Sequence, residues 1–115
     1  MEAKYERQLK KGILDMLVLK LLSEQKMYGY QMIQELSKRS HQMFVLKEGT
    51  LYPILYRLEN DGYVESVWNL PKEKEIARKY YVITYQGKEL LEELKELWKL
   101  YAIAVNEILE VDQND

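Results

Sequence analysis

Apolar side chains near the amino terminus recur at intervals of three and four residues, which is the spacing of one face of an α-helix. Leu9, Ile13, Met16 and Leu17 keep this spacing, and the residues after them are apolar on nearly every side. A helix that is apolar all round is surrounded by other elements. The pattern therefore predicts one helix over about residues 5–23, at the centre of the core.

Two shorter helices are predicted next along the chain. The first covers about residues 28–40. The second runs from Thr50, whose hydroxyl suits an N-cap, to Gly62, which suits the left-handed position just past a helix end. Pro53 falls in the predicted first turn, where its missing N–H has no partner in any case. The inner face of this helix carries Leu51, Ile54, Leu55 and Leu58.

Two β-strands follow the last of these helices. Residues 63–68 alternate between two sets of side chains, as in a strand with two unlike faces, and residues 79–84 form the returning strand. The connection between them is too long for a tight hairpin turn. A helix that runs directly into a two-stranded ribbon is typical of a winged helix-turn-helix, which presents a recognition helix and a wing to DNA.

A long helix is predicted at the carboxyl end, with Thr84 as its N-cap. From Lys88 to Glu110 the apolar residues recur mostly at intervals of three and four. Such a helix would be roughly 35 Å long, more than the small domain covers, so its stripe needs a second partner. We expect a second copy of the chain there. The stripe residues expected at the dimer interface are Leu90, Leu94, Leu97, Trp98, Tyr101, Val105 and Ile108.

The predicted fold class is mainly α with a small α+β element. Residues 1–84 form the winged helix-turn-helix, residues 85–111 the dimerisation helix and residues 112–115 a disordered tail. The 115 residues hold no cysteine, which excludes disulfides and thiolate metal sites and fits a reducing cytoplasm. An apolar signal core and a bilayer-spanning stretch are both absent, so we expect a cytoplasmic protein.

The net charge of −2 hides an asymmetry along the chain. Residues 1–85 hold 14 Lys and Arg and 11 Asp and Glu, a net of +3. Residues 86–115 hold 3 Lys and Arg and 8 Asp and Glu, a net charge of −5. A basic front and an acidic back suit a protein that turns one face toward phosphate, although ordinary solvated charges would give the same totals.

Five segments resemble the PadR family of transcriptional regulators, in this order: Gly12–Leu19, Tyr28–Tyr30, Glu48–Leu55, Arg57–Gly62 and Arg78–Thr84. The third, Glu-Gly-Thr-Leu-Tyr-Pro-Ile-Leu, is highly specific. The resemblance implies a DNA-binding regulator with a winged helix-turn-helix that binds an inverted repeat as a homodimer. Many members carry glycine and arginine at the wing tip, whereas residues 70–77 here have balanced charge and no glycine. The resemblance therefore does not extend to a minor-groove contact at that tip.

A recognition helix enters the major groove by its amino-terminal end, while the preceding helix crosses the backbone. Basic residues at the start of the second strand could neutralise phosphate. For Arg57 two interpretations stay open: a contact with phosphate or a guanine edge, or an ion pair with Asp61 one turn later. The residues expected at the DNA interface are Tyr30, Gln31, Thr50, Leu51, Tyr52, Pro53, Tyr56, Arg57, Arg78 and Lys79.

The single helix after the wing resembles the smaller branch of the family. That branch includes multidrug-sensing repressors with a tryptophan of the last helix at the dimer centre, and Trp98 holds the matching place. Trp98 is either an ordinary interface residue or one wall of a site where flat aromatic ligands stack. Asp15 would attract cationic ligands there or bond to Lys11 or solvent, and the second reading is slightly preferred. The residues expected to line the site are Leu9, Gly12, Asp15, Met16, Trp98 and Tyr101.

Enzyme and metal functions find little support in the residues. His41 is the only histidine, and one histidine offers neither a catalytic triad nor a metal cluster. No glycine-rich phosphate loop is present, and no cofactor is expected. We therefore predict a repressor that is released by a small aromatic or apolar ligand. The alternatives are a repressor without such a ligand and a winged-helix dimer that makes only protein–protein contacts.

Overall fold

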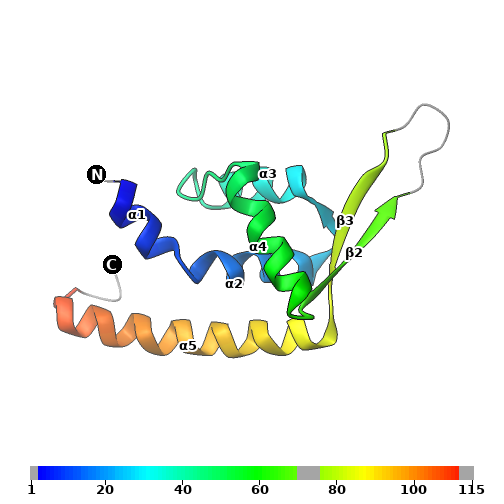
Figure 1. Cartoon of the computed structure of the whole chain (residues 1–115). Helices are drawn as coiled ribbons and strands as arrows, with labels where there is room; N and C mark the ends of the chain where they lie inside the picture. Colours follow the sequence, from blue (N-terminus) through cyan, green and yellow to red (C-terminus); the bar gives the residue numbers. More distant parts are fainter. Residues whose placement is uncertain (1–2, 70–75, 112–115) are drawn as a thin grey trace.

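The structure, a computed structural model, describes residues 3–69 and 76–111. The helices are α1 (Ala3–Lys10), α2 (Ile13–Glu24), α3 (Gly29–Arg39), α4 (Glu48–Asn60) and α5 (Tyr85–Leu109). The strands β1 (Met27–Tyr28), β2 (Val64–Asn69) and β3 (Arg78–Ile83) form an antiparallel sheet in the order β1-β3-β2. The mainly helical winged helix-turn-helix fold is thereby confirmed (Figure 1). None of the described helices is long and apolar enough to cross a membrane.

The prediction of one continuous helix over residues 5–23 is wrong. The segment is broken between α1 and α2 by a turn at Lys11 and Gly12, where Gly12 has a φ of 87°. Glycine adopts this left-handed conformation without the Cβ penalty of other residues. The apolar spacing hid the break, because Leu9 and Ile13 are four residues apart on either side of it. Leu9 is in fact exposed.

The start of α4 also differs from the prediction. Lys47 is the N-cap, and the backbone N–H of Thr50 donates to the Lys47 carbonyl oxygen over 3.0 Å, so Thr50 lies inside the first turn. Its assignment as N-cap is wrong. Pro53 consequently lies one turn into the helix, and the ring removes the hydrogen bond that the Gly49 carbonyl would otherwise accept.

The end of α4 matches the prediction. Gly62 has a φ of 84°. The N–H of Tyr63 donates to the Leu58 carbonyl over 2.9 Å, and the N–H of Gly62 donates to that of Glu59 over 3.1 Å. These are the two bonds of a Schellman motif, which satisfies the last carbonyls of the helix.

The strands β2 and β3 connect α4 to α5. β2 pairs with β3 from Val64 opposite Ile83 to Asn69 opposite Arg78. Thr84 is confirmed as the N-cap of α5, because its Oγ1 accepts from the N–H of Gly87 over 3.0 Å. The two-residue strand β1, which pairs with the middle of β3, was not predicted from the sequence. It is too short to show a periodic pattern.

The core gathers around α2. Its members come from every element except α1: Leu14, Val18, Leu19, Leu21, Leu22, Met27, Met32, Leu36, Leu46, Leu51, Ile54, Leu55, Leu58, Val64, Tyr81 and Leu91. Only Leu91 belongs to α5, which runs alongside α2 and continues past it toward the end of the molecule where α1 lies (Figure 1). The predictions for the wing tip at residues 70–75 and the tail at residues 112–115 lie outside the described residues.

Candidate nucleic-acid interface

The helices α3 and α4 meet through Tyr52. A Cβ added to Gly29 would lie 2.5 Å from the Tyr52 hydroxyl oxygen, so the tyrosine covers the start of α3 where only glycine leaves room. Burial raises the pKa of the Tyr52 phenol, and the nearby Glu48 carboxylate adds to the shift. Tyr52 is therefore half-buried where α3 and α4 meet, and only part of its side chain is exposed to a binding partner.

The outward face of α4 carries most of the residues that were expected to meet DNA. Thr50, Pro53, Tyr56 and Arg57 are exposed on it. Leu51 is 0% exposed and belongs to the core, so it does not contribute to this outward face. A short polar and aromatic surface is thus presented along the first three turns of the helix.

The start of α3 lies next to this face and carries two more of the predicted contacts, Tyr30 and Gln31. Tyr30 is exposed. The Gln31 side chain is directed backward, where its Oε1 accepts from the Tyr28 N–H over 3.1 Å and caps the helix. This bond holds Gln31 in one orientation and uses one of its two polar atoms.

A groove of about 430 Å³ separates α4 from the wing. Arg78 lies over the Tyr28 ring, 4.6 Å from its centroid. Lys79 Nζ lies 5.6 Å from the Tyr56 centroid and 5.4 Å from that of Tyr81. Aromatic faces attract cations in this geometry, so Arg78 and Lys79 of β3 are held beside these rings. The groove is lined by Tyr28, Tyr52, Tyr56, Trp68, Ala77, Arg78 and Lys79.

Tyr81 lies beneath this groove in the core. Its hydroxyl is buried and has no hydrogen-bond partner among residues 3–69 and 76–111. Burial, followed by the charges of Tyr56, Glu59 and Tyr52, raises the pKa of the Tyr81 phenol to about 12. The hydroxyl is therefore neutral at physiological pH and contributes its ring, rather than its polar atom, to the fold.

Arg57 does not pair with Asp61, which was one of the two contacts considered for it from the sequence, and its contact with phosphate or a guanine edge stays a prediction. It is paired across the molecule with Asp15 of α2, with 2.5 Å between Nη2 and Oδ1. The Arg57 side chain is 53% exposed and that of Asp15 is 24% exposed. This pair also corrects the expectation for Asp15, which was thought to bond to Lys11 or solvent. About half of the Arg57 side chain remains exposed to solvent.

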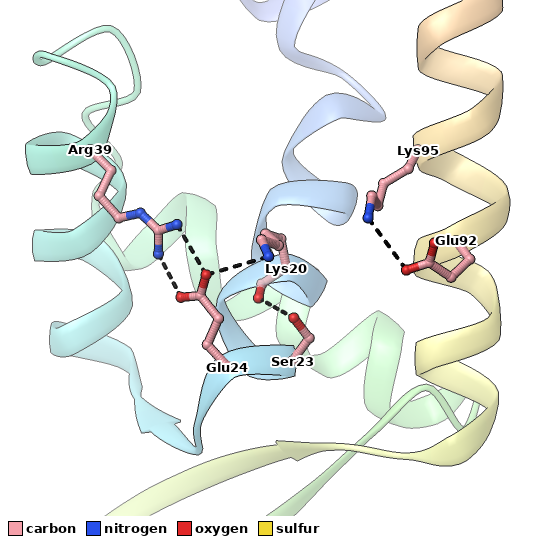
Figure 2. Close-up of polar contacts among 6 residues, drawn as sticks. All are labelled: Lys20, Ser23, Glu24, Arg39, Glu92 and Lys95. Atoms are coloured by element: carbon pink, nitrogen blue, oxygen red, sulfur yellow. Dashed lines mark hydrogen bonds and ion pairs between the residues drawn. The ribbon is translucent and has the colours of Figure 1, made fainter.

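A second ion-pair cluster ties α3 to α2 (Figure 2). Glu24 accepts two hydrogen bonds from Arg39, over 2.6 and 3.1 Å, and lies 3.5 Å from Lys20 Nζ. The Arg39 bonds are the main cause that lowers the pKa of the Glu24 carboxyl. The guanidinium fork of Arg39 is therefore occupied by Glu24.

A separate groove of about 280 Å³ lies between α2 and α5. It brings together four of the six residues that were expected at a ligand site, namely Gly12, Met16, Trp98 and Tyr101. Leu9 and Asp15 do not line it. The residues missed from the sequence are Lys11, Ile13, Leu94 and Leu97, although the last two belong to the predicted apolar stripe.

The stripe on α5 changes character along the helix. Leu90 and Leu94 pack against the core of the same chain. Farther along, Trp98 is 51% exposed and Ile108 is 80% exposed. The exposed apolar residues of this half are Leu97, Trp98, Leu100, Tyr101, Ile103, Val105, Ile108 and Leu109. Leu100, Ile103 and Leu109 are exposed as well, and they were not among the residues that the sequence predicted for a dimer interface.

Groups of histidine, aspartate and glutamate that could hold a metal ion do not occur in the part of the chain that the structure describes. His41 is exposed in the connector between α3 and α4, with a φ of 52°. The arrangement is suited to binding along a polar and aromatic surface.

Residues 18–93 match the transcriptional regulator PadR-like family. "Uncharacterized protein X" of Lysinibacillus sphaericus is 40% identical over 88 residues, which cover 76% of this chain and 80% of that protein. A PadR family transcriptional regulator from Eggerthella lenta is similar in structure, with a TM-score of 0.81, 33% identity and coverage of 96% of this chain and 93% of that one. A PadR-like transcriptional regulator from Bacillus cereus gives a TM-score of 0.77 and 33% identity over 91% and 99% of the two chains.

Proposed function

The chain belongs to the PadR-like family of transcriptional regulators, and we propose that it is a dimeric repressor whose hold on DNA is released by a small ligand. Its family is one of DNA-binding regulators rather than enzymes. As a regulator that has to reach DNA, it would act in the cytoplasm.

The surface that we propose for DNA contact consists of the outward face of α4 and the basic start of β3. The observation that carries this proposal is their juxtaposition: Lys79 lies 5.6 Å from the ring of Tyr56, which is exposed on α4. The helix would enter the major groove by its amino-terminal end, with Thr50 and Tyr52 nearest the bases. Arg78 and Lys79 would contact phosphates beside it.

We propose that α5 pairs with α5 of a second copy, so that residues 1–84 act as the DNA-binding part and residues 85–111 as the dimerisation part. The exposed apolar stripe from Leu97 to Ile108 supports this, because a monomer would leave it in water. A two-fold dimer would direct two recognition helices to one face. The matching DNA target is an inverted repeat with half-sites about one helical turn apart.

The ligand site that we propose lies in the groove between α2 and α5. In a dimer, Trp98 of each chain would approach the two-fold axis, and a flat aromatic or apolar compound would stack against it. A ligand that separates the two tryptophans changes the spacing of the recognition helices. It therefore favours a dimer form that fits DNA less well.

Titration of a duplex that carries the inverted repeat tests the DNA surface. Arg78→Ala and Lys79→Ala should weaken binding to every duplex alike and reduce its salt dependence, because each removes a phosphate contact. Tyr52→Phe should also change sequence preference. Lys20→Ala is the matched control, because Lys20 does not line the groove between α4 and the wing, and it should change little. Binding that is independent of salt, or equal for all duplexes, would contradict the proposal.

The ligand site is tested by tryptophan fluorescence in a Trp68→Phe background, which leaves Trp98 as the only reporter. Planar aromatic dyes should quench Trp98 and weaken operator binding. Operator DNA should weaken dye binding by the same factor, because the coupling is reciprocal. Trp98→Ala should abolish dye binding and preserve DNA binding. If bound dye leaves operator affinity unchanged, the chain is a regulator that is controlled by another route.

A further inference from the structure

A pocket of about 350 Å³ opens between α1, the start of α2 and the recognition helix α4. Its floor is apolar and nearly buried, formed by Leu14, Leu46 and Ile54. Its rim is strongly basic, since four cationic side chains face one carboxylate. The charged members are Arg7, Lys10, Lys11, Arg57 and Asp15.

The one carboxylate in this pocket is already engaged. Asp15 accepts from Arg57 over 2.5 Å. Arg7, Lys10 and Lys11 form no ion pair with any residue in the ranges 3–69 and 76–111. Lys10 lines the pocket as well, and its ammonium lies over the Phe44 ring, 5.9 Å from the centroid, with no carboxylate of the described residues paired to it. Three positive charges therefore surround an apolar hollow without a matching anion.

We propose that this pocket binds a small amphipathic anion, with a compact apolar body that carries a carboxylate or sulfonate. The apolar body would cover the floor and remove it from water. The anionic group would accept charge-assisted hydrogen bonds from the rim, which are stronger than bonds between neutral groups. A phosphate of DNA supplies the charge, but it has no apolar body to cover Leu14, Leu46 and Ile54.

This site is distinct from the Trp98 groove and goes beyond the function proposed above. The two hollows share Lys11 and Gly12 of the turn between α1 and α2, and no other lining residue. The anion site lies wholly within one chain, so it does not depend on a dimer. Thr50, Ile54 and Arg57 form one of its walls, so the bound anion touches the recognition helix itself.

A pair of matched dyes tests the proposal in the full-length Trp98→Ala protein, which lacks the competing aromatic wall. 8-Anilinonaphthalene-1-sulfonate carries the anion, and N-phenyl-1-naphthylamine is its neutral analogue. Arg7→Gln together with Lys10→Gln should lower affinity for the sulfonate about tenfold or more, since two charge-assisted bonds are lost. The same change should leave affinity for the neutral dye almost unaltered.

The control is Lys4→Gln together with Lys20→Gln, which removes the same two charges from residues outside the pocket. It should leave sulfonate affinity within about twofold of the parent, because neither lysine lines the pocket and solvent screens exposed charges. Thermal unfolding of all variants establishes that each is folded. Failure of the sulfonate to bind, or equal losses in the two double variants, would overturn the proposal.

Intermolecular NOEs locate the bound dye independently of the charge changes. Contacts from the naphthalene protons to the methyl groups of Leu14 and Ile54 are expected. Contacts to Met16 and Leu94 instead would place the dye in the α2–α5 groove and would also overturn the proposal. Neither result depends on DNA binding, so the anion site and the repressor function stand or fall separately.

Discussion

The helices α4 and α5 are both amphipathic, but a single chain buries the whole apolar face of α4 only. Every apolar residue on the inner face of α4 is buried, from Leu51 at 0% to Ile54 at 7% exposed. In α5 only Gly87 and Leu91 are buried, and Ile108 is 80% exposed. Both helices are periodic in sequence, and they differ in how much of the apolar face is buried within one chain.

This difference separates two kinds of contact. The exposed face of α4 is polar and aromatic, so its partner must offer hydrogen-bonding groups and charge, as DNA does. The exposed half of α5 is aliphatic and aromatic, so its partner must offer another apolar surface. Substitutions in α4 should accordingly change stability or DNA binding, whereas those in distal α5 should change association first.

The largest effect is expected from Val105→Glu together with Ile108→Glu. Both side chains are exposed in the isolated chain, so the monomer should remain folded. If α5 pairs with a second copy, the two substitutions remove four buried side chains from the dimer, two from each chain. At about 1.5–3 kcal/mol for each side chain, the dimer should weaken by about four orders of magnitude or more. Sedimentation equilibrium measures this change.

Lys95→Glu is the control for charge on the same helix and should leave the dimer intact. Its ammonium is 3.4 Å from Glu92 on the solvent side, where one surface pair contributes little. If the double glutamate variant sediments like the parent protein, the distal stripe of α5 is not the dimer interface.

Leu55→Ala should have the opposite character. Leu55 is fully buried in the core, and its truncation should lower the free energy of unfolding by about 2–5 kcal/mol. The loss arises within one chain, so it should persist when measured on the dissociated Val105→Glu/Ile108→Glu protein. Urea denaturation in the two backgrounds measures it. If Leu55→Ala lowered the free energy of unfolding only in the dimer, α4 would depend on the second chain as α5 does.

Sequence periodicity was sufficient where an element is long and its apolar face is continuous. The extent of α5, its Thr84 cap and the glycine end of α4 could be predicted because each depends on neighbouring residues. The break at Gly12 could not, because glycine at that position is compatible with the helical spacing on both sides. β1 could not either, because two residues carry no period.

The contacts that give the site its chemistry were harder to predict, because they join residues far apart in sequence. Arg57 pairs with Asp15 across 42 positions, and nothing local distinguishes that partner from Asp61. The aromatic supports of Arg78 and Lys79 depend on how the wing folds against α4. In contrast, Trp98 and Met16 could be expected to meet, since both lie on apolar stripes of helices that pack together.

Tyr81→Phe tests the core that the buried face of α4 shares with β3. The Tyr81 phenol has a pKa of about 12 in the folded protein, against about 10 when exposed. Folding therefore favours its neutral form, and the corresponding stability is complete below pH 10 and is lost as pH rises through 12. Relative to the Phe variant, the parent should lose roughly 2 kcal/mol by pH 12.

Below pH 10 the Phe variant should be as stable as the parent or slightly more so, because it removes a buried hydroxyl that has no partner among the described residues. Urea denaturation at pH 8, 10 and 11.5 measures both trends. Parallel pH profiles for the two proteins would show that the hydroxyl is hydrated in the folded state.

The smallest effect is expected where α4 meets the wing. Tyr56→Leu removes the ring 5.6 Å from Lys79 Nζ, whereas Tyr56→Phe keeps it. If the ring holds the ammonium in place for a phosphate, the Leu variant should bind the inverted repeat about two- to fivefold more weakly than the Phe variant. This corresponds to a cation–π contribution of about 0.5–1 kcal/mol.

In a Lys79→Ala background this difference between the Leu and Phe variants should vanish, because residues in direct contact are energetically coupled. Lys26→Ala supplies the matched control: Lys26 lies over Tyr80, 5.2 Å from its centroid, so the difference between Leu and Phe at position 56 should persist there in full. A difference that survives the loss of Lys79 would mean that Tyr56 contacts DNA directly, and that the outward face of α4 acts without support from the wing.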